Sequence, residues 1–135
     1  MTHAHTKQVL NVGQCQPDHN SIRRFLLAEF GAETEYCADI SAAMKRLCEQ
    51  EFDLVLVNRT IDATLDEGSE LIQQMKESEF LRDVPVMMVS NFDSAQIAAT
   101  DLGAVAGFGK AHLEENETRD LLRPYLGTQS PTADA

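Results

Sequence analysis

Two short apolar runs constrain the fold of this chain more than any other feature of its sequence. Residues 52–57 have the sequence FDLVLV and residues 84–89 have the sequence VPVMMV. A strand with one face in water alternates apolar and polar residues, whereas a parallel strand covered on both faces is apolar almost throughout. Pro85 is compatible with the second run because it stands near its start. The two runs therefore predict parallel strands in a sheet with both faces covered.

The rest of the chain alternates between strand-like and helical patterns. The expected strands are residues 8–13, 34–37, 52–57, 84–89 and 106–109, and the expected helices are residues 17–30, a segment beginning near Asp39 or Ser41, a segment around 71–75, and residues 95–102 and 113–126. Pro124 must kink or shorten the last helix. Strict alternation with right-handed crossovers places helices on both faces of a parallel sheet. We therefore expect an α/β fold with a five-stranded, doubly wound sheet in the order 2-1-3-4-5 and five helices, the flavodoxin-like arrangement.

Length and charge limit the class of protein. The 135 residues suit one domain, expected at residues 7–126 between disordered tails at 1–6 and 127–135. Acidic residues outnumber basic ones by 22 to 11, which gives a net charge of −11 and argues against nucleic-acid binding. No apolar run approaches the roughly 20 residues of a membrane span. We expect a cytoplasmic protein with no membrane partner.

Ligands of doubly wound sheets bind just outside the carboxyl ends of the strands. The residues expected there are Gln14 and Cys15 after the first strand, Asn58 after the third, Ser90 after the fourth and Lys110 after the fifth. The connection at residues 59–68 is longer than most strand-to-helix loops, which makes it a candidate functional loop.

The chain has three cysteines, Cys15, Cys37 and Cys48, and no C-x-x-C pair. This pattern fits neither a disulfide framework nor a thiolate zinc site. We expect three reduced thiols, with Cys37 and Cys48 filling space in the core.

Four segments together resemble the receiver domain of two-component response regulators. They are Pro17-Asp18 at the start of a helix, FDLVLVN at residues 52–58, VPVMMVS at 84–90 and LGAVAGFGK at 102–110. The resemblance extends over about residues 7–126. It implies the receiver fold and a role in phosphorelay signal transduction.

The resemblance also implies roles for single positions. In the family, two acidic residues after the first strand and a phosphoacceptor aspartate after the third hold Mg²⁺, and the aspartate takes a phosphoryl group from the phosphohistidine of a kinase. A serine or threonine after the fourth strand and a lysine after the fifth hold the phosphoryl oxygens. This chain keeps those last two, as Ser90 and Lys110. The degenerate positions are Gln14 and Cys15 for the acidic pair, Asn58 for the phosphoacceptor, Gly107 for the aromatic switch and Ala111 for the proline that usually follows the lysine.

These departures predict an atypical pseudo-receiver with no metal and no cofactor. The Asn58 amide is neutral and resonance-stabilised, so it lacks the nucleophilicity of a carboxylate. Mg²⁺ in such sites is held by carboxylates, and Gln14, Cys15 and Asn58 supply none. The pocket is therefore expected to contain Lys110 as its single charged residue.

Lys110 needs a partner because an unpaired buried ammonium is costly. It could extend to water, pair with Asp62, Asp66 or Asp93, or donate to the side-chain oxygens of Asn58 and Gln14. We favour the two amides. Structural roles remain open for three neighbours: Ser90 could cap the following helix, Asn58 could be a turn residue, and Asp18 is expected to cap the first helix.

The expected function is that of a stand-alone signalling module, not an enzyme, which contacts a histidine kinase or a downstream output protein without being phosphorylated. The expected partner face combines residues 95–102, 107–109 and 114–126, and a homodimer through this face is also expected. Two alternatives stay open: phosphorylation at Asp62 or Asp66, and binding of a small anion or ligand on the same fold.

Two enzyme-like or cofactor-binding readings are weaker. Cys15 before a helix N-terminus resembles the nucleophile of low-molecular-weight phosphatases and arsenate reductases. Those enzymes need an arginine six residues further on, where this chain has Ser21. Flavodoxins cradle a phosphate in a loop rich in hydroxyl groups after the first strand, and residues 14–17 contain no hydroxyl group.

Overall fold

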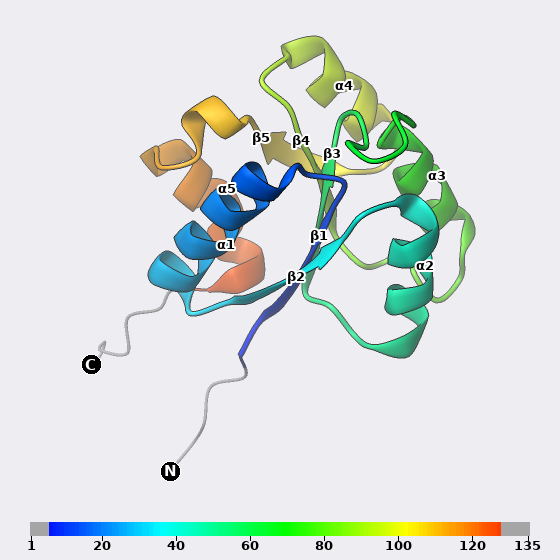
Figure 1. Ribbon diagram of the computed structural model, residues 1–135, viewed down its shortest axis with the longest axis horizontal. Helices are drawn as coiled ribbons and strands as arrows, with labels where there is room; N and C mark the ends of the chain where they lie inside the picture. The colour runs from blue at the N-terminus through cyan, green and yellow to red at the C-terminus, as the bar shows by residue number, and fades with distance from the viewer. Residues whose placement is uncertain (1–5, 128–135) are drawn as a thin grey trace.

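The computed structural model describes residues 6–127. The strands are β1 (Gln8–Val12), β2 (Glu33–Cys37), β3 (Leu54–Asn58), β4 (Val86–Val89) and β5 (Val105–Phe108). The helices are α1 (Gln16–Phe30), α2 (Ile40–Glu49), α3 (Ser69–Glu77), α4 (Asp93–Asp101), a short 3₁₀ helix η1 (Lys110–His112) and α5 (Asn116–Leu126). Strands and helices alternate along the chain from end to end (Figure 1).

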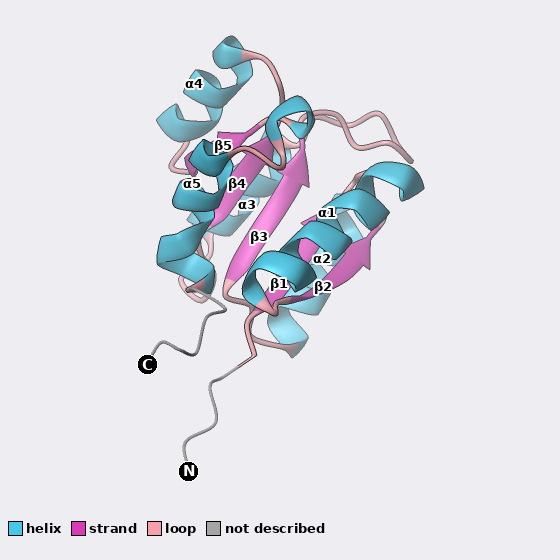
Figure 2. Cartoon of the chain, turned by 90° about the vertical axis from the view of Figure 1, so that its left-hand side faces the viewer, coloured by secondary structure: helices cyan, strands magenta, loops and turns pink. Residues whose placement is uncertain are grey.

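All five strands are parallel and lie in the order β2-β1-β3-β4-β5. The expected α/β, doubly wound, flavodoxin-like arrangement is therefore confirmed. Figure 2 shows α1 and α5 on one face of the sheet, with α2 and α3 on the other. The carboxyl ends of the strands share one edge, where the predicted site residues stand.

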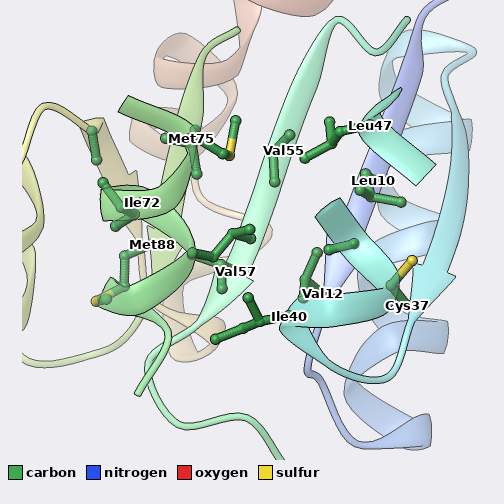
Figure 3. Close-up of a cluster of buried hydrophobic side chains, with 14 of the residues drawn as sticks. Leu10, Val12, Cys37, Ile40, Leu47, Val55, Val57, Ile72, Met75 and Met88 are labelled. Atoms are coloured by element: carbon green, nitrogen blue, oxygen red, sulfur yellow. The ribbon is translucent and has the colours of Figure 1, made fainter. Parts of the chain in front are cut away.

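The core has two layers because alternate side chains of each strand point to opposite faces. Leu10 and Val12 of β1 pack with Val55 and Val57 of β3 under α2, α3 and α4 (Figure 3). Val9 and the alternate residues of β3 pack under α1 and α5. The central strands bury both faces, which explains why residues 52–57 contain almost no polar position.

Two helix ends agree with the sequence. Gly31 ends α1 in a left-handed conformation with φ of 65°. The side chain of Asp39, not that of Ser41, caps α2 by accepting the Ala42 N–H at 2.8 Å. Glycine and aspartate are strong sequence signals at these positions because each residue allows backbone groups that a helix end leaves unpaired to form hydrogen bonds.

Two expectations are corrected. The last helix begins at Asn116, not at residue 113, because residues 113–115 form a turn that follows η1. The helix ends at Leu126 as expected, with Pro124 inside its last turn. Cys37 is buried as expected, but Cys48 is exposed and fills no core space.

The expected tails lie mostly outside the described residues, at 1–5 and 128–135, so their disorder stays a prediction. Within residues 6–127, no helix has the length and hydropathy of a membrane span.

Candidate functional site

The structure brings Asn58, Ser90 and Lys110 together at the carboxyl edge of the sheet. They line a pocket of about 190 Å³. The other lining residues are Arg59, Thr60, Val89, Asn91 and Phe92. Gln14 and Cys15, which the family pattern places beside this pocket, do not line it. Asp62 and Asp66 do not line it either.

Asn58 fixes the loops around it. Its Nδ2 donates to the carbonyl oxygen of Gly13 at 3.1 Å, and the Asp62 N–H donates to the same oxygen at 2.9 Å. An ionised aspartate at position 58 has no proton to donate and would direct an oxygen toward the Gly13 carbonyl. The present hydrogen bond therefore depends on an amide at this position.

The long connection after β3 is folded back on itself. Thr60 pairs with Glu67 in an antiparallel bridge, and Ile61 is fully buried. A Cβ atom on Gly13 would lie 2.5 Å from Cδ1 of Ile61, so this side chain packs against the β1 turn where only glycine fits. The connection is thus a packed cover over the β1 and β3 ends.

Lys110 pairs with a residue that the sequence did not suggest for it. Its Nζ lies 2.7 Å from Oδ2 of Asp18, in the first turn of α1. The expected bonds to Asn58 and Gln14 are not formed, and no pair with Asp62, Asp66 or Asp93 is found among the described residues. The Lys110 hydrogen bond, aided by one from the Cys15 thiol, holds the pKa of the Asp18 carboxyl below its usual value.

The expected helix cap is corrected at the same point. The residue at the N-cap of α1 is Cys15, which makes no side-chain cap bond, and Asp18 lies inside the helix. Asp18 has the correct residue type for a cap, but its carboxylate binds Lys110. Lys110 is therefore paired with Asp18, and Arg59 is a second cation that lines the pocket, so Lys110 is not its single charged residue as the sequence predicted.

The first-strand positions do not fit a magnesium ion. Gln14 is fully buried, and neither polar atom of its side chain has a hydrogen-bond partner. An amide and a thiol replace the two carboxylates, and the nearby Asp18 is occupied by Lys110. Among residues 6–127, no three His, Cys, Asp or Glu side chains lie close enough to hold a metal ion. A hard cation that prefers anionic oxygen finds no such set here.

Two polar contacts order the segments that follow β4 and β5. Ser90 Oγ accepts the Phe92 N–H at 3.1 Å, which orders the turn before α4. The N-cap of α4 is Phe92, with no side-chain cap bond, so the expected capping role of Ser90 is corrected. Asn91 Oδ1 accepts the Ala111 N–H at 3.1 Å. Proline, the usual family residue after the lysine, has no N–H to donate. Ala111 therefore makes a cross-connection that the family pattern excludes.

Gln96 of α4 was not singled out by its sequence pattern, yet it joins three elements. Its Nε2 donates to the carbonyl oxygens of Met88 at 2.8 Å and Ser90 at 3.2 Å, and its Oε1 accepts the Gly107 N–H at 3.0 Å. This amide stands where the β4–β5 pairing shifts register. A Cβ on Gly107 would lie 2.1 Å from the Met88 oxygen. The position of the family's aromatic switch thus accommodates no side chain, and we call this arrangement the Gln96 clamp.

The chain belongs to the response regulator receiver domain family, whose model matches residues 16–119. Receiver domains are, in general, signalling modules that act on kinases or output proteins. No curated protein matches the chain.

Solved receiver structures share the fold at low sequence identity. A response regulator receiver protein from Pseudomonas putida has a TM-score of 0.74 at 18% identity, over 90% of this chain and 99% of that one. A sensor protein from Polaromonas sp. JS666 has a TM-score of 0.77 at 14% identity, over 89% of this chain and 95% of that one. NtrX from Brucella abortus has a TM-score of 0.70 at 18% identity over 87% of this chain, which spans only 26% of NtrX. Such identities establish the common fold alone.

Proposed function

We propose that this receiver domain signals through protein–protein contacts without being phosphorylated. Its partner in this proposal is a histidine kinase or a downstream output protein. The observation that carries the proposal is the hydrogen bond from Asn58 to Gly13, because the phosphoacceptor position donates a proton instead of offering a nucleophilic oxygen.

The charges around the pocket support the same conclusion. Phosphoryl transfer to a receiver requires a carboxylate nucleophile and a divalent cation that offsets the charge of the phosphoryl group. Asn58, Gln14 and Cys15 are uncharged. Lys110 is already engaged by Asp18. We therefore propose a non-enzymatic module that uses neither metal nor cofactor.

The Gln96 clamp explains how such a module could hold one signalling conformation. Family members carry an aromatic side chain at the position of Gly107, and the resemblance implies that it moves on activation. Here there is no side chain to move, and three hydrogen bonds hold α4 against β4 and β5. We propose that the α4–β5–α5 surface has a fixed form that does not depend on the pocket.

That surface carries apolar side chains that a partner could cover. Ile97 on α4 is 62% exposed and Phe92 at its start is 59% exposed. This supports a partner or a homodimer on the α4–β5–α5 face. The net charge of −11 and the absence of a spanning helix within residues 6–127 support a cytoplasmic module that binds neither nucleic acid nor membrane.

The proposal is tested by intact-mass measurement after incubation with acetyl phosphate and Mg²⁺. We expect no phosphate adduct on the wild-type protein. The matched control is the triple variant Gln14→Asp, Cys15→Asp, Asn58→Asp, which restores the family's three carboxylates and is expected to gain an adduct labile to hydroxylamine. Such an adduct on the wild-type chain would overturn the proposal.

Phosphorylation at Asp62 or Asp66 is the alternative that this assay also addresses. Both aspartates are exposed and lie in the connection after β3, away from the lining of the Lys110 pocket. A wild-type adduct that disappears in Asp62→Asn or Asp66→Asn would establish this alternative.

A small-ligand module is the second candidate, and one observation favours it. A larger pocket of about 460 Å³ lies beside the first, between the N-termini of α3 and α4. Arg59 stands on its rim with its guanidinium 5.2 Å from the centre of the Phe92 ring. Binding of a small aromatic carboxylate such as benzoate, lost in Arg59→Gln, would support this candidate.

A further inference from the structure

The opposite edge of the sheet, at the amino ends of the strands, carries the most exposed large apolar side chain of the described residues. Phe80 lies in the turn between α3 and β4, and 93% of it is exposed. The next residue, Leu81, is buried, with only 5% of its surface exposed. A fully solvated phenylalanine contributes nothing to the core, since burial is the source of its stabilising effect. Exposed aromatic residues next to a hollow are typical of interaction sites.

A groove of about 400 Å³ lies beside Phe80, between the end of α2 and the start of β4. Its apolar part includes Leu47, Phe52 and Leu81, all of which also belong to the core or its edge. Because these side chains are held by packing, the groove does not depend on a mobile loop for its shape. Its volume suits one or two large apolar side chains of a partner.

The charged residues that line the groove are all acidic. They are Glu51, Asp53 and Asp83, and no lysine or arginine is among the described residues that line it. Asp53 also accepts the backbone N–H of Gln8 at 2.8 Å, while Glu51 and Asp83 are exposed. Arg46, whose guanidinium lies 5.8 Å from the centre of the Phe52 ring, is already paired with glutamates of α2 and β2, and the exposed Arg82 does not line the groove. The rim of the groove is therefore negatively charged, and its floor is apolar.

We infer that this groove binds a basic amphipathic segment of a partner protein. An apolar side chain of the segment packs against Phe80 and enters the hollow, and its lysine or arginine residues face Glu51 and Asp83. A second copy of this chain is a poor occupant of this groove, because the acidic rim requires a basic segment and the chain has only 11 basic residues against 22 acidic ones. The inference rests on the proposed role in protein–protein contact and adds to it the site and the chemistry of a partner.

The experiment is an NMR titration of the full ¹⁵N-labelled chain with a synthetic helical peptide of leucine and lysine. A peptide with glutamate in place of lysine is the charge control. We expect the amide signals of residues 47–53 and 80–84 to shift, while those of α4 stay in place. Raising the salt concentration is expected to weaken binding, because the rim contacts are electrostatic and exposed.

Two variants make the result decisive. Phe80→Ser is expected to weaken binding of the lysine peptide by roughly tenfold or more, as for an aromatic anchor. Leu27→Ser, which removes a half-exposed leucine from α1, is expected to leave the affinity unchanged. The inference fails if the two variants bind alike, if the glutamate peptide binds equally well, or if the shifts centre on α4. Sedimentation that shows a dimer lost in Phe80→Ser would assign the groove to a second copy and overturn it too. None of these outcomes bears on the phosphorylation assay, so the two proposals fail separately.

Discussion

The two edges of the sheet differ in how far their side chains are engaged by neighbouring residues. At the carboxyl edge, Asn58 donates to Gly13 and Lys110 pairs with Asp18, although the buried Gln14 amide has no partner. At the amino edge, Phe80 stands in solvent above a hollow with an acidic rim. A side chain whose polar groups are already paired gains little from a new ligand, whereas an exposed aromatic ring gains by being covered. Under the proposed function, the contacts of Asn58 and Lys110 serve stability, and recognition lies elsewhere.

The largest effect is expected from adding a side chain at Gly107. In Gly107→Ala, the new Cβ would lie 2.1 Å from the Met88 carbonyl oxygen, a backbone atom that cannot rotate away. We expect the free energy of unfolding, measured by urea denaturation, to fall by about 2–3 kcal/mol. Ala106→Ser, one residue earlier and exposed, serves as the control and should change it by less than about 0.5 kcal/mol. Equal stability of both variants would mean that β4 and β5 are not as close as the Gln96 clamp requires.

A somewhat smaller effect is expected from removing the amide of the clamp. Gln96→Leu keeps most of the side-chain volume but leaves the Gly107 N–H and the Met88 carbonyl without this partner. The expected loss is about 1–2 kcal/mol, with faster hydrogen exchange at the Gly107 amide. Gln74→Leu, at an exposed position of α3, is the matched control. Unchanged exchange at Gly107 in Gln96→Leu would show that the clamp does not hold this part of the sheet.

Most of the fold could be predicted because its signals are local or periodic. The continuous apolar character of residues 52–57 and 84–89 indicated buried parallel strands, and Gly31 and Asp39 marked helix ends. The predicted start of the last helix was wrong because residues 113–115, which include the apolar Leu113 and two glutamates typical of a first helical turn, form a turn instead. The prediction that Cys48 fills space in the core was wrong, because helical spacing alone does not show how wide the buried stripe of α2 is.

The candidate site was only partly predictable. The positions of Asn58, Ser90 and Lys110 follow from the parallel sheet, since strands of one direction end at one edge. The partner of Lys110 did not follow, because Asp18 is 92 residues away in sequence and reaches the lysine only because α1 and the segment after β5 pack on the same face of the sheet. Gln96 was missed for a similar reason. Its role depends on a register shift between β4 and β5 that no sequence pattern marks.

The Asp18–Lys110 pair should contribute a small, pH-dependent stability. Because the folded-state pKa of Asp18 is lowered, the pair stabilises the protein above the ordinary pKa of about 3.8, and this contribution is lost as the pH falls through the folded value. Asp18→Asn is therefore expected to lower the free energy of unfolding by about 0.5–1 kcal/mol at neutral pH, since both side chains are about one-third exposed. The difference from wild type should shrink as the pH falls below about 4. Asp62→Asn is the control, and the pH dependence of its free energy of unfolding should run parallel to that of the wild type. A constant Asp18→Asn difference down to low pH would show that the carboxylate charge is not what holds Lys110.

The smallest effect on stability is expected at the amino edge, and its smallness is informative. Phe80→Ser removes a ring that is 93% exposed, so the free energy of unfolding should change by less than about 0.5 kcal/mol. Leu81→Ala, at the neighbouring buried position, should lower it by about 2–3 kcal/mol, because it opens a cavity in the core. If Phe80→Ser were as destabilising as Leu81→Ala in urea denaturation, Phe80 would be a packing residue and its exposure would carry no implication for binding. A Phe80→Ser variant of unchanged stability that still binds the lysine peptide more weakly would separate recognition from stability at a single side chain.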